Sequence, residues 1–218
     1  MLIEDLGTIP YRDAWAIQEQ AHADVLAGAE PRVLILQHPP VITFGRRGPT
    51  QHLLTPEPRL RELGVELVES DRGGDVTFHG PGQLVAYPIL RLADYQLSPS
   101  SYVHTLERIL IQTLADLGVP AHTDPAAVGV WVNHAPLANS QLATAAKIAA
   151  IGVRIRRGVS LHGLALNVST DLRFFDLITP CGLTRPVTSL TQLLGDRSPS
   201  FADVRSLLSR HFLATFAR

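Results

Sequence analysis

Two reactive residue types are almost missing from the sequence: its 218 residues include one cysteine, Cys181, and one lysine, Lys147. A single cysteine excludes an internal disulfide, which agrees with a reducing compartment and leaves a free thiol to explain. The other 18 of the 19 basic residues are arginines, which do not lose their proton in proteins, whereas a lysine ammonium can. Lys147 is therefore either a retained titratable amine or a surface lysine left by chance.

The sequence also lacks an excess of charge and any apolar run of membrane-spanning length. A net charge of -1 gives no global attraction to nucleic acid or anionic lipid, so neither is expected as a partner. Glu4 and Asp5 stand where a signal peptide would carry basic and then apolar residues, which favours a cytoplasmic protein. With 45% hydrophobic and 18% charged residues, we expect one globular domain over residues 1–218.

Periodic apolar patterns predict three helices. The first covers residues 11–27 and ends before Gly28; the second is capped by Ser100 or Ser101 and ends at Gly118. The third follows the capping motif Ser200-x-x-Asp203.

Short runs rich in β-branched residues predict strands between these helices. The expected strands cover residues 33–37, 41–44, 65–69, 76–78, 83–90 and 128–132, and a hairpin covers 148–155 and 159–168. A tight, glycine-dependent reversal is expected at 79–82 and a surface loop at 49–58, while 133–146 fits no pattern. Because the elements show no regular βαβ alternation, the expected fold class is α+β, with a mixed sheet flanked by helices.

Cys181 lies in the segment Thr179-Pro180-Cys181-Gly182, where proline fixes the entry and glycine permits a sharp turn. The thiol is therefore either presented as a nucleophile or buried as a packing residue. A free thiol with a pKa of ~8.5 needs a nearby cation to become largely thiolate at neutral pH. Lys147 is the candidate cation, although sequence alone leaves their contact open.

The densest motif runs from Arg72-Gly73-Gly74-Asp75 through His79 to Gln83 and contains four glycines. Its amides can approach a carbonyl or carboxylate closely, or the glycines can simply form two tight turns around a strand. His79 is either a ligand contact or a hydrogen-bonded structural residue, and the same holds for His162. Nine histidines without a second cysteine give no zinc-like spacing, so no metal is expected.

Several arginines form pairs or clusters in predicted turns. They either dock an acidic protein or form solvated turns. These residues are Arg46, Arg47, Arg154, Arg156 and Arg157.

Taken in order, the motifs resemble those of the lipoate-biosynthesis octanoyltransferases, which are similar in fold to lipoate–protein and biotin–protein ligases. The resemblance covers most of the chain. It rests on His38-Pro39-Pro40-Val41 with Gly45-Arg46-Arg47, Arg72-Gly73-Gly74 through Gln83, Gly129-Val130-Trp131-Val132, Lys147-Ile148-Ala149-Ala150-Ile151-Gly152, His162-Gly163-Leu164-Ala165-Leu166-Asn167 and Pro180-Cys181-Gly182. The stretch 133–146 looks longer than the family's usual connection.

The resemblance implies transfer of an octanoyl group from acyl carrier protein to a lysine amine of lipoyl domains, through a thioester on Cys181. The acceptors would be 2-oxoacid dehydrogenases and the glycine-cleavage H protein. Lys147 would be the partner of Cys181, and no cofactor is expected. The implied acyl site consists of Arg72, Gly73, Gly74, Asp75, Val76, Thr77, Phe78, His79, Ala150, Ile151, Gly152, His162, Gly163 and Leu164.

Two other functions remain open from the sequence. One is an ATP-dependent lipoate–protein ligase on the same scaffold, which would not need the Cys181 thiol. The other is a non-catalytic acyl- or protein-binding module, in which Cys181 and Lys147 would both be replaceable.

Overall fold

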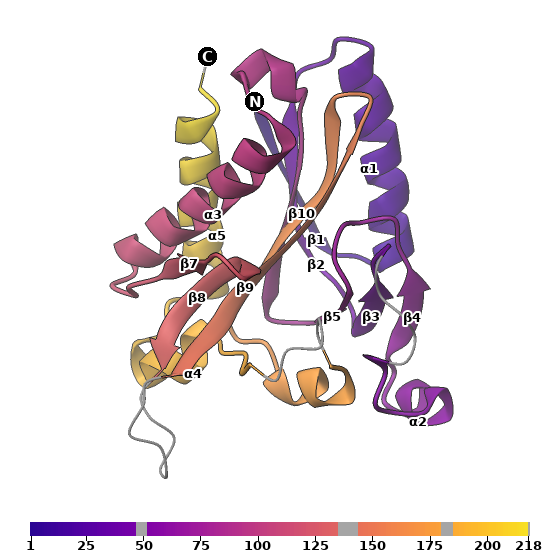
Figure 1. Ribbon diagram of the computed structural model, residues 1–218, viewed down its shortest axis with the longest axis vertical. Helices are drawn as coiled ribbons and strands as arrows, with labels where there is room; N and C mark the ends of the chain where they lie inside the picture. Colours follow the sequence, from indigo (N-terminus) through magenta and orange to yellow (C-terminus); the bar gives the residue numbers. More distant parts are fainter. Residues whose placement is uncertain (47–51, 135–143, 180–184, 218) are drawn as a thin grey trace.

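A seven-stranded mixed sheet forms the centre of the computed structural model, which describes residues 1–46, 52–134, 144–179 and 185–217 (Figure 1). Its strand order is β1-β2-β6-β10-β9-β8-β7. The strands are β1 (Leu2–Thr8), β2 (Arg32–Gln37), β6 (Gln83–Ile89), β7 (His122–Asp124), β8 (Ala127–His134), β9 (Thr144–Arg156) and β10 (Val159–Asn167). Among the strand pairs described in this sheet, only β1–β2 is parallel.

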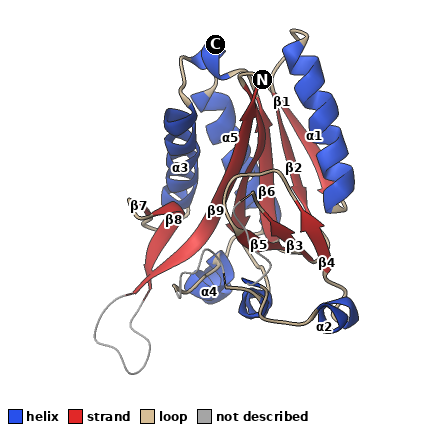
Figure 2. Ribbon diagram, turned by 45° about the vertical axis from the view of Figure 1, so that its right-hand side comes forward, coloured by secondary structure: helices blue, strands red, loops and turns tan. Residues whose placement is uncertain are grey.

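The central strands read as continuous apolar runs because helices cover both faces of the sheet. Helix α1 (Tyr11–Leu26) packs on one face of β2, β6 and β10. Helices α3 (Pro99–Asp116) and α5 (Phe201–Thr215) pack on the opposite face (Figure 2). The expected mixed sheet between helices is confirmed.

A second, three-stranded sheet lies at one end of the large one. Its order is β4-β3-β5, and its core includes Ile42, Leu60 and Phe78. The elements around it are β3 (Val41–Phe44), α2 (Glu57–Glu62), β4 (Glu66–Glu69), β5 (Val76–His79) and the 3-10 turn η3 (Leu172–Leu177). The short elements η2 (Leu92–Tyr95), α4 (Leu190–Leu194) and η5 (Gly195–Arg197) complete the described chain.

Most elements expected from periodicity are present, including the hairpin of β9 and β10, which turns at Arg157 and Gly158. The reversal at 79–82 is different from the simple hairpin that its turn chemistry suggests. It carries the chain from β5 in the small sheet to β6 in the large sheet, so its two strands do not pair with each other. The sequence predicted the turn correctly but not the partners of its strands.

Three smaller expectations are corrected. Helix α2 begins at Glu57, inside the stretch 49–58 that we expected to be loop. Helix α3 is capped by Ser98, not by Ser100 or Ser101. Strand β9 begins at Thr144 and not at residue 148, so Lys147 lies inside the strand.

Within the part of the chain that the structure describes, no helix combines the length and the apolar character needed to cross a membrane.

The cap of α3 gives a test of the fold. The Ser98 hydroxyl accepts the Ser101 backbone N–H at 3.1 Å, while the Ser101 hydroxyl accepts the Ser98 N–H at 2.8 Å. Ser98→Ala should lower the free energy of unfolding by about 1 kcal/mol, because the Ser101 N–H at the helix start loses its acceptor. Ser100→Ala, in the same exposed turn, serves as the control and should change it by less than about 0.5 kcal/mol. Urea unfolding would measure both, and an equal loss in the two variants would contradict the assignment of the cap.

Candidate functional site

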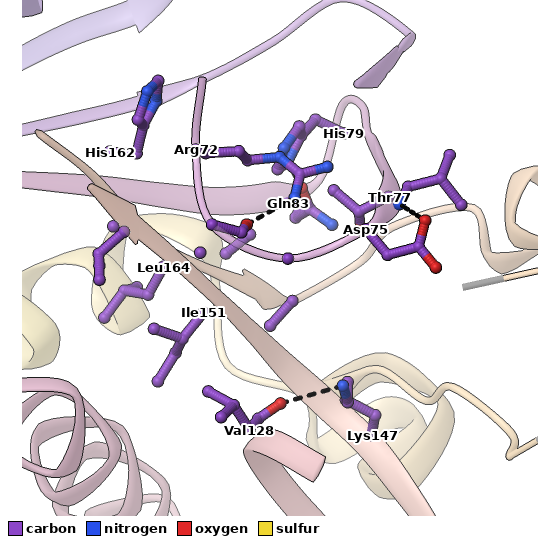
Figure 3. Close-up of a pocket in the computed structure, with 18 of the residues that line it drawn as sticks. Arg72, Asp75, Thr77, His79, Gln83, Val128, Lys147, Ile151, His162 and Leu164 are labelled. Carbon is purple, nitrogen blue, oxygen red and sulfur yellow. Dashed lines mark hydrogen bonds between the residues drawn. The ribbon is translucent and has the colours of Figure 1, made fainter. Parts of the chain in front are cut away.

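A cavity of about 630 Å³ lies between a glycine-rich loop, which leads into β5, and strands β6, β9 and β10 (Figure 3). Its lining mixes small and apolar residues with a few polar side chains. Such a concave site with few polar groups is typical of small-ligand binding. The residues that line the cavity include Arg72, Gly73, His79, Lys147, Gly152 and His162.

The loop touches β9 through bare backbone. The Gly73 N–H donates to the Val153 carbonyl at 3.0 Å. A Cβ on Gly73 would lie 2.8 Å from that carbonyl oxygen, and a Cβ on Gly152 would lie 2.9 Å from the Gly73 oxygen. These distances leave no space for a side chain at either position.

Arg72 fixes the loop to the small sheet from the other side. Its guanidinium donates to the Thr43 carbonyl at 2.6 Å and to the Thr43 hydroxyl at 2.9 and 3.0 Å. A further N–H donates to the Gly73 carbonyl at 3.0 Å. Because arginine stays charged, Arg72 places a permanent positive charge in the cavity wall.

Two buried imidazoles near the cavity are neutral. His38 donates from Nδ1 to the Ile9 carbonyl at 2.8 Å, since a carbonyl can only accept, and its Nε2 accepts the Tyr87 hydroxyl at 2.8 Å. Burial lowers the pKa of His38 to about 4. Burial lowers the pKa of His79 to about 3. The positive charges of His38, which is protonated once the pH falls below about 4, and of Arg72 add to this shift. At neutral pH, His79 therefore offers hydrogen bonds but no charge.

His79 belongs to a chain of amide hydrogen bonds. Its Nδ1 lies 2.7 Å from the Gln83 side-chain oxygen. Gln83 donates in turn to the Asn167 side chain at 2.9 Å, and Asn167 donates to the Thr188 carbonyl at 3.0 Å. The Thr188 N–H donates to the Lys147 carbonyl at 2.9 Å, so the chain connects His79 with the backbone of Lys147.

His162 is held in an unusual conformation on β10. Its φ of +57° belongs to the left-handed region, which is uncommon for a residue with a Cβ. Its N–H donates to the Gln18 side-chain oxygen at 2.7 Å, and its Nε2 lies 2.6 Å from an Asp71 carboxylate oxygen. Asp71 also pairs with Arg154. Burial is the main reason that the pKa of His162 falls to about 3.

Lys147 lies at the other end of the group of side chains from His162 (Figure 3). Its Nζ donates to the Val128 carbonyl at 3.1 Å and lies 4.8 Å from the centre of the Trp131 ring. The register of β9 and β10 places His162 opposite Val153, six residues beyond Lys147 along β9. Six strand residues span roughly 20 Å, so the two side chains mark separate ends of the site.

The cavity brings together most of the residues named from the sequence. Its lining includes Arg72, Gly73, Gly74, Asp75, Val76, Thr77, His79, Lys147, Ala150, Ile151, Gly152, His162, Gly163 and Leu164. Phe78 is not among the lining residues and stacks on Phe174 at 4.8 Å, in the core of the small sheet. Neighbouring side chains of a strand point to opposite faces, so a continuous run through β5 cannot face the cavity throughout. Cys181 and Gly182 lie outside the described residues.

Sequence reasoning missed several lining residues, among them Tyr11, Tyr87 and Asn167. Tyr11 reads as the start of an amphipathic helix, and Tyr87 as one more apolar position of a buried strand. Asn167 ends the motif that begins at His162. A polar amide directly after an apolar strand is a sequence signal for a buried hydrogen-bonding residue, and it could have identified Asn167.

The arginine clusters are partly engaged within the chain. Arg154 pairs with Asp71, and Arg156 pairs with Glu19. Arg47 lies outside the described residues. Among the residues that are described, no group of three or more His, Cys, Asp or Glu side chains could hold a metal ion.

Comparison with known proteins gives close relatives. A model of the lipoyl protein ligase A/B catalytic domain matches residues 10–213. An octanoyltransferase of Solibacter usitatus is 46% identical over 215 residues, which cover 98% of this chain and 92% of that protein. An octanoyltransferase of Bacteroides fragilis is 44% identical over 218 residues, which cover 96% of this chain and 95% of that protein.

Solved structures share the fold at much lower identity. A bi-partite lipoate protein ligase from Thermoplasma acidophilum has a TM-score of 0.71 at 18% identity and covers 98% of this chain and 82% of that one. A lipoate-protein ligase A bound with ATP has a TM-score of 0.72 at 19% identity and covers 99% and 85%. A biotin protein ligase from Aquifex aeolicus has a TM-score of 0.54 at 9% identity and covers 99% and 68%.

The neutral imidazoles predict how stability changes with pH. In the unfolded chain a histidine binds a proton below about pH 6.5, whereas His38, His79 and His162 have folded-state pKa values of about 4, 3 and 3. The unfolded state therefore binds more protons, and stability should fall as pH is lowered from 7 towards 4, by up to about 1.4 kcal/mol per pH unit for each imidazole.

His38→Gln is the matched variant. Its side-chain amide can still donate to the Ile9 carbonyl and accept from the Tyr87 hydroxyl, but it does not titrate. Urea unfolding at pH values from 7 to 5 should give a shallower pH dependence for this variant. Identical slopes for the variant and the wild type would contradict the neutral state of His38.

Proposed function

The chain belongs to the lipoyl protein ligase A/B catalytic domain family, and within that family we propose that it transfers an octanoyl group to lipoate-dependent proteins through a thioester on Cys181. The chain is an acyltransferase, as its octanoyltransferase relatives indicate. The observation that carries the proposal is the position of Lys147, the sole lysine of the chain. Lys147 lies in the wall of a cavity that the glycine-rich loop also lines.

We take octanoyl acyl carrier protein as the donor. The acceptors are the lipoyl domains of 2-oxoacid dehydrogenases and the glycine-cleavage H protein. Donor and acceptor are both proposed from the likeness to octanoyltransferases. We further propose that residues 1–218 form one catalytic domain, which would carry out both transfer steps. The reaction belongs in the cytoplasm, where the Cys181 thiol would stay reduced.

The cavity suits an acyl chain. Ile151 and Leu164 supply apolar surface, and Ala150 and Gly152 leave space beside them. Burying about seven methylene or methyl groups at ~0.8 kcal/mol each favours binding by several kcal/mol. The low pKa values of His79 and His162 suit this role, because at neutral pH neither imidazole adds a charge to the walls that an apolar tail would contact. Together with the rest of the predicted acyl site, these residues would hold the octanoyl group.

In the first step the Cys181 thiolate attacks the carbonyl carbon of the carrier thioester. The new C–S bond forms a tetrahedral oxyanion, which backbone amides of the glycine-rich segments stabilise. The oxyanion collapses, the bond to the carrier sulfur breaks, and the Lys147 ammonium gives its proton to the leaving thiolate. This step leaves an octanoyl thioester and a neutral Lys147 amine.

In the second step the neutral amine of the acceptor lysine attacks the thioester carbonyl. The Lys147 amine takes the proton from the attacking nitrogen, the amide forms, and Cys181 leaves as thiolate. The thiolate and ammonium of the starting state are thereby restored. Arginine at this position would supply the charge but not the proton transfer.

The first test is intact-mass measurement after mixing the enzyme with octanoyl carrier protein. The wild type should gain one octanoyl adduct, and Cys181→Ser should gain no thioester. An adduct that persists unchanged in Cys181→Ser would contradict the thioester on Cys181. Acceptor modification that needs a nucleotide in that variant would support an ATP-dependent ligase instead.

The second test concerns the role of Lys147 as a proton carrier. Lys147→Arg should retain some ability to form thiolate but lose roughly 10²–10⁴-fold in the rate of transfer, because the guanidinium cannot release a proton. Lys147→Ala should lose both the charge and the proton carrier. Rapid-quench measurement of acceptor octanoylation would separate them, and a Lys147→Arg rate close to wild type would reduce Lys147 to an electrostatic partner.

A further inference from the structure

Helix α3 carries one glutamate that points inward. Glu107 is 4% exposed, which is rare for a glutamate unless its carboxylate is paired. One carboxylate oxygen accepts the Gly129 backbone N–H at 3.2 Å, and the other lies 2.9 Å from Nδ1 of the exposed His104 side chain. Glu107 therefore joins α3 to the beginning of β8.

The receiving residue, Gly129, has a backbone that other residues rarely adopt. Its φ is +128°, and a Cβ at this position would lie 2.7 Å from the Ala149 carbonyl oxygen. The same Cβ would lie 3.4 Å from Cε of Lys147, so the glycine backbone borders directly on the lysine side chain. One side of Gly129 thus binds Glu107, and the other side faces Lys147.

The pairing of β8 with β9 is irregular at this point. Val130 pairs with Ala149, but the next residue, Trp131, pairs with Lys147, so Ile148 is an extra residue in β9. A bulge of this kind turns a side chain away from the regular strand direction. It brings Lys147 over the Trp131 ring, with Nζ donating to the carbonyl of Val128, the residue before Gly129.

We infer that Glu107 is a positioning residue for Lys147: by holding the Gly129 amide, it fixes the Val128 carbonyl that receives the lysine ammonium. This inference rests on the proposed role of Lys147 in acyl transfer. Without the carboxylate, the Gly129 N–H would be buried without its acceptor, and the peptide unit of Val128 and Gly129 near the start of β8 would change its orientation. The Lys147 amine would then lose the carbonyl that orients it between the two transfer steps.

Two substitutions separate the hydrogen bond from the charge. Glu107→Gln keeps an oxygen at the same reach and removes the charge, whereas Glu107→Asp keeps the charge and shortens the reach. If the hydrogen bond positions Lys147, Glu107→Gln should transfer octanoyl groups within about 3-fold of the wild-type rate, while Glu107→Asp should lose at least about 10-fold in kcat with little change in KM for the acceptor.

The control is Thr113→Val on the same helix, where a fully buried hydroxyl bonds only within α3, to the Ile109 carbonyl at 2.8 Å. It should lower Tm without changing kcat per active site. Steady-state rates are divided by the amount of thioester that the enzyme forms in a single turnover, so partial unfolding does not count as lost activity.

Equal kcat values for wild type, Glu107→Asp and Glu107→Gln would overturn the inference, as would a slow Glu107→Gln beside an active Glu107→Asp. Failure of the proposed function is a different result. In that case wild-type enzyme would form no thioester, or Lys147→Arg would transfer as fast as wild type.

Discussion

The close backbone contact between Gly73 and β9 is the constraint on which the site depends. The glycine-rich loop leads into β5 of the small sheet, whereas Val153 and Gly152 belong to the large sheet. Because neither Gly73 nor Gly152 has space for a Cβ, the backbone of the loop approaches the backbone of β9 to hydrogen-bonding distance. Arg72 secures the same loop to Thr43, so both sides of the loop are fixed before any ligand binds. The cavity is consequently bounded by rigid elements, which is what precise placement of a reacting carbonyl requires.

A second consequence of this tight construction is that several polar groups in and behind the cavity wall already have partners within the protein. His38 serves Ile9 and Tyr87, while His79 serves Gln83. Buried imidazoles in such surroundings remain neutral, and the positive charge of Arg72 adds to the effect at His79. An apolar chain can enter such a site without displacing hydrogen bonds between protein groups. In the proposed acyl site, the polar residues would thus set the shape and the apolar ones would supply the affinity.

Local patterns in the sequence predicted what is local in the structure. The helices at 11–27 and after Ser200 and the hairpin of β9 and β10 follow from spacing and turn residues. What was missed depends on distant partners. The turn at 79–82 fixes a reversal but does not say that its strands join different sheets, and a glutamate at position 107 reads as one more exposed helical charge. Phe78 shows the same limit within the site, because strand alternation assigns it to the core of the small sheet rather than to the cavity.

Two cationic side chains, Lys147 and Arg185, lie over the indole ring of Trp131. Lys147 Nζ lies 4.8 Å from the ring centre and Arg185 Cζ lies 5.0 Å from it. The ring stabilises both cations electrostatically, because the face of an aromatic ring attracts a positive charge from either side chain. Only the amine can also release a proton, and only its position borders the glycine backbone that Glu107 holds. The chain otherwise uses arginine where it could use lysine. At position 147 either residue would supply the positive charge, but only lysine could carry out the proposed proton transfer.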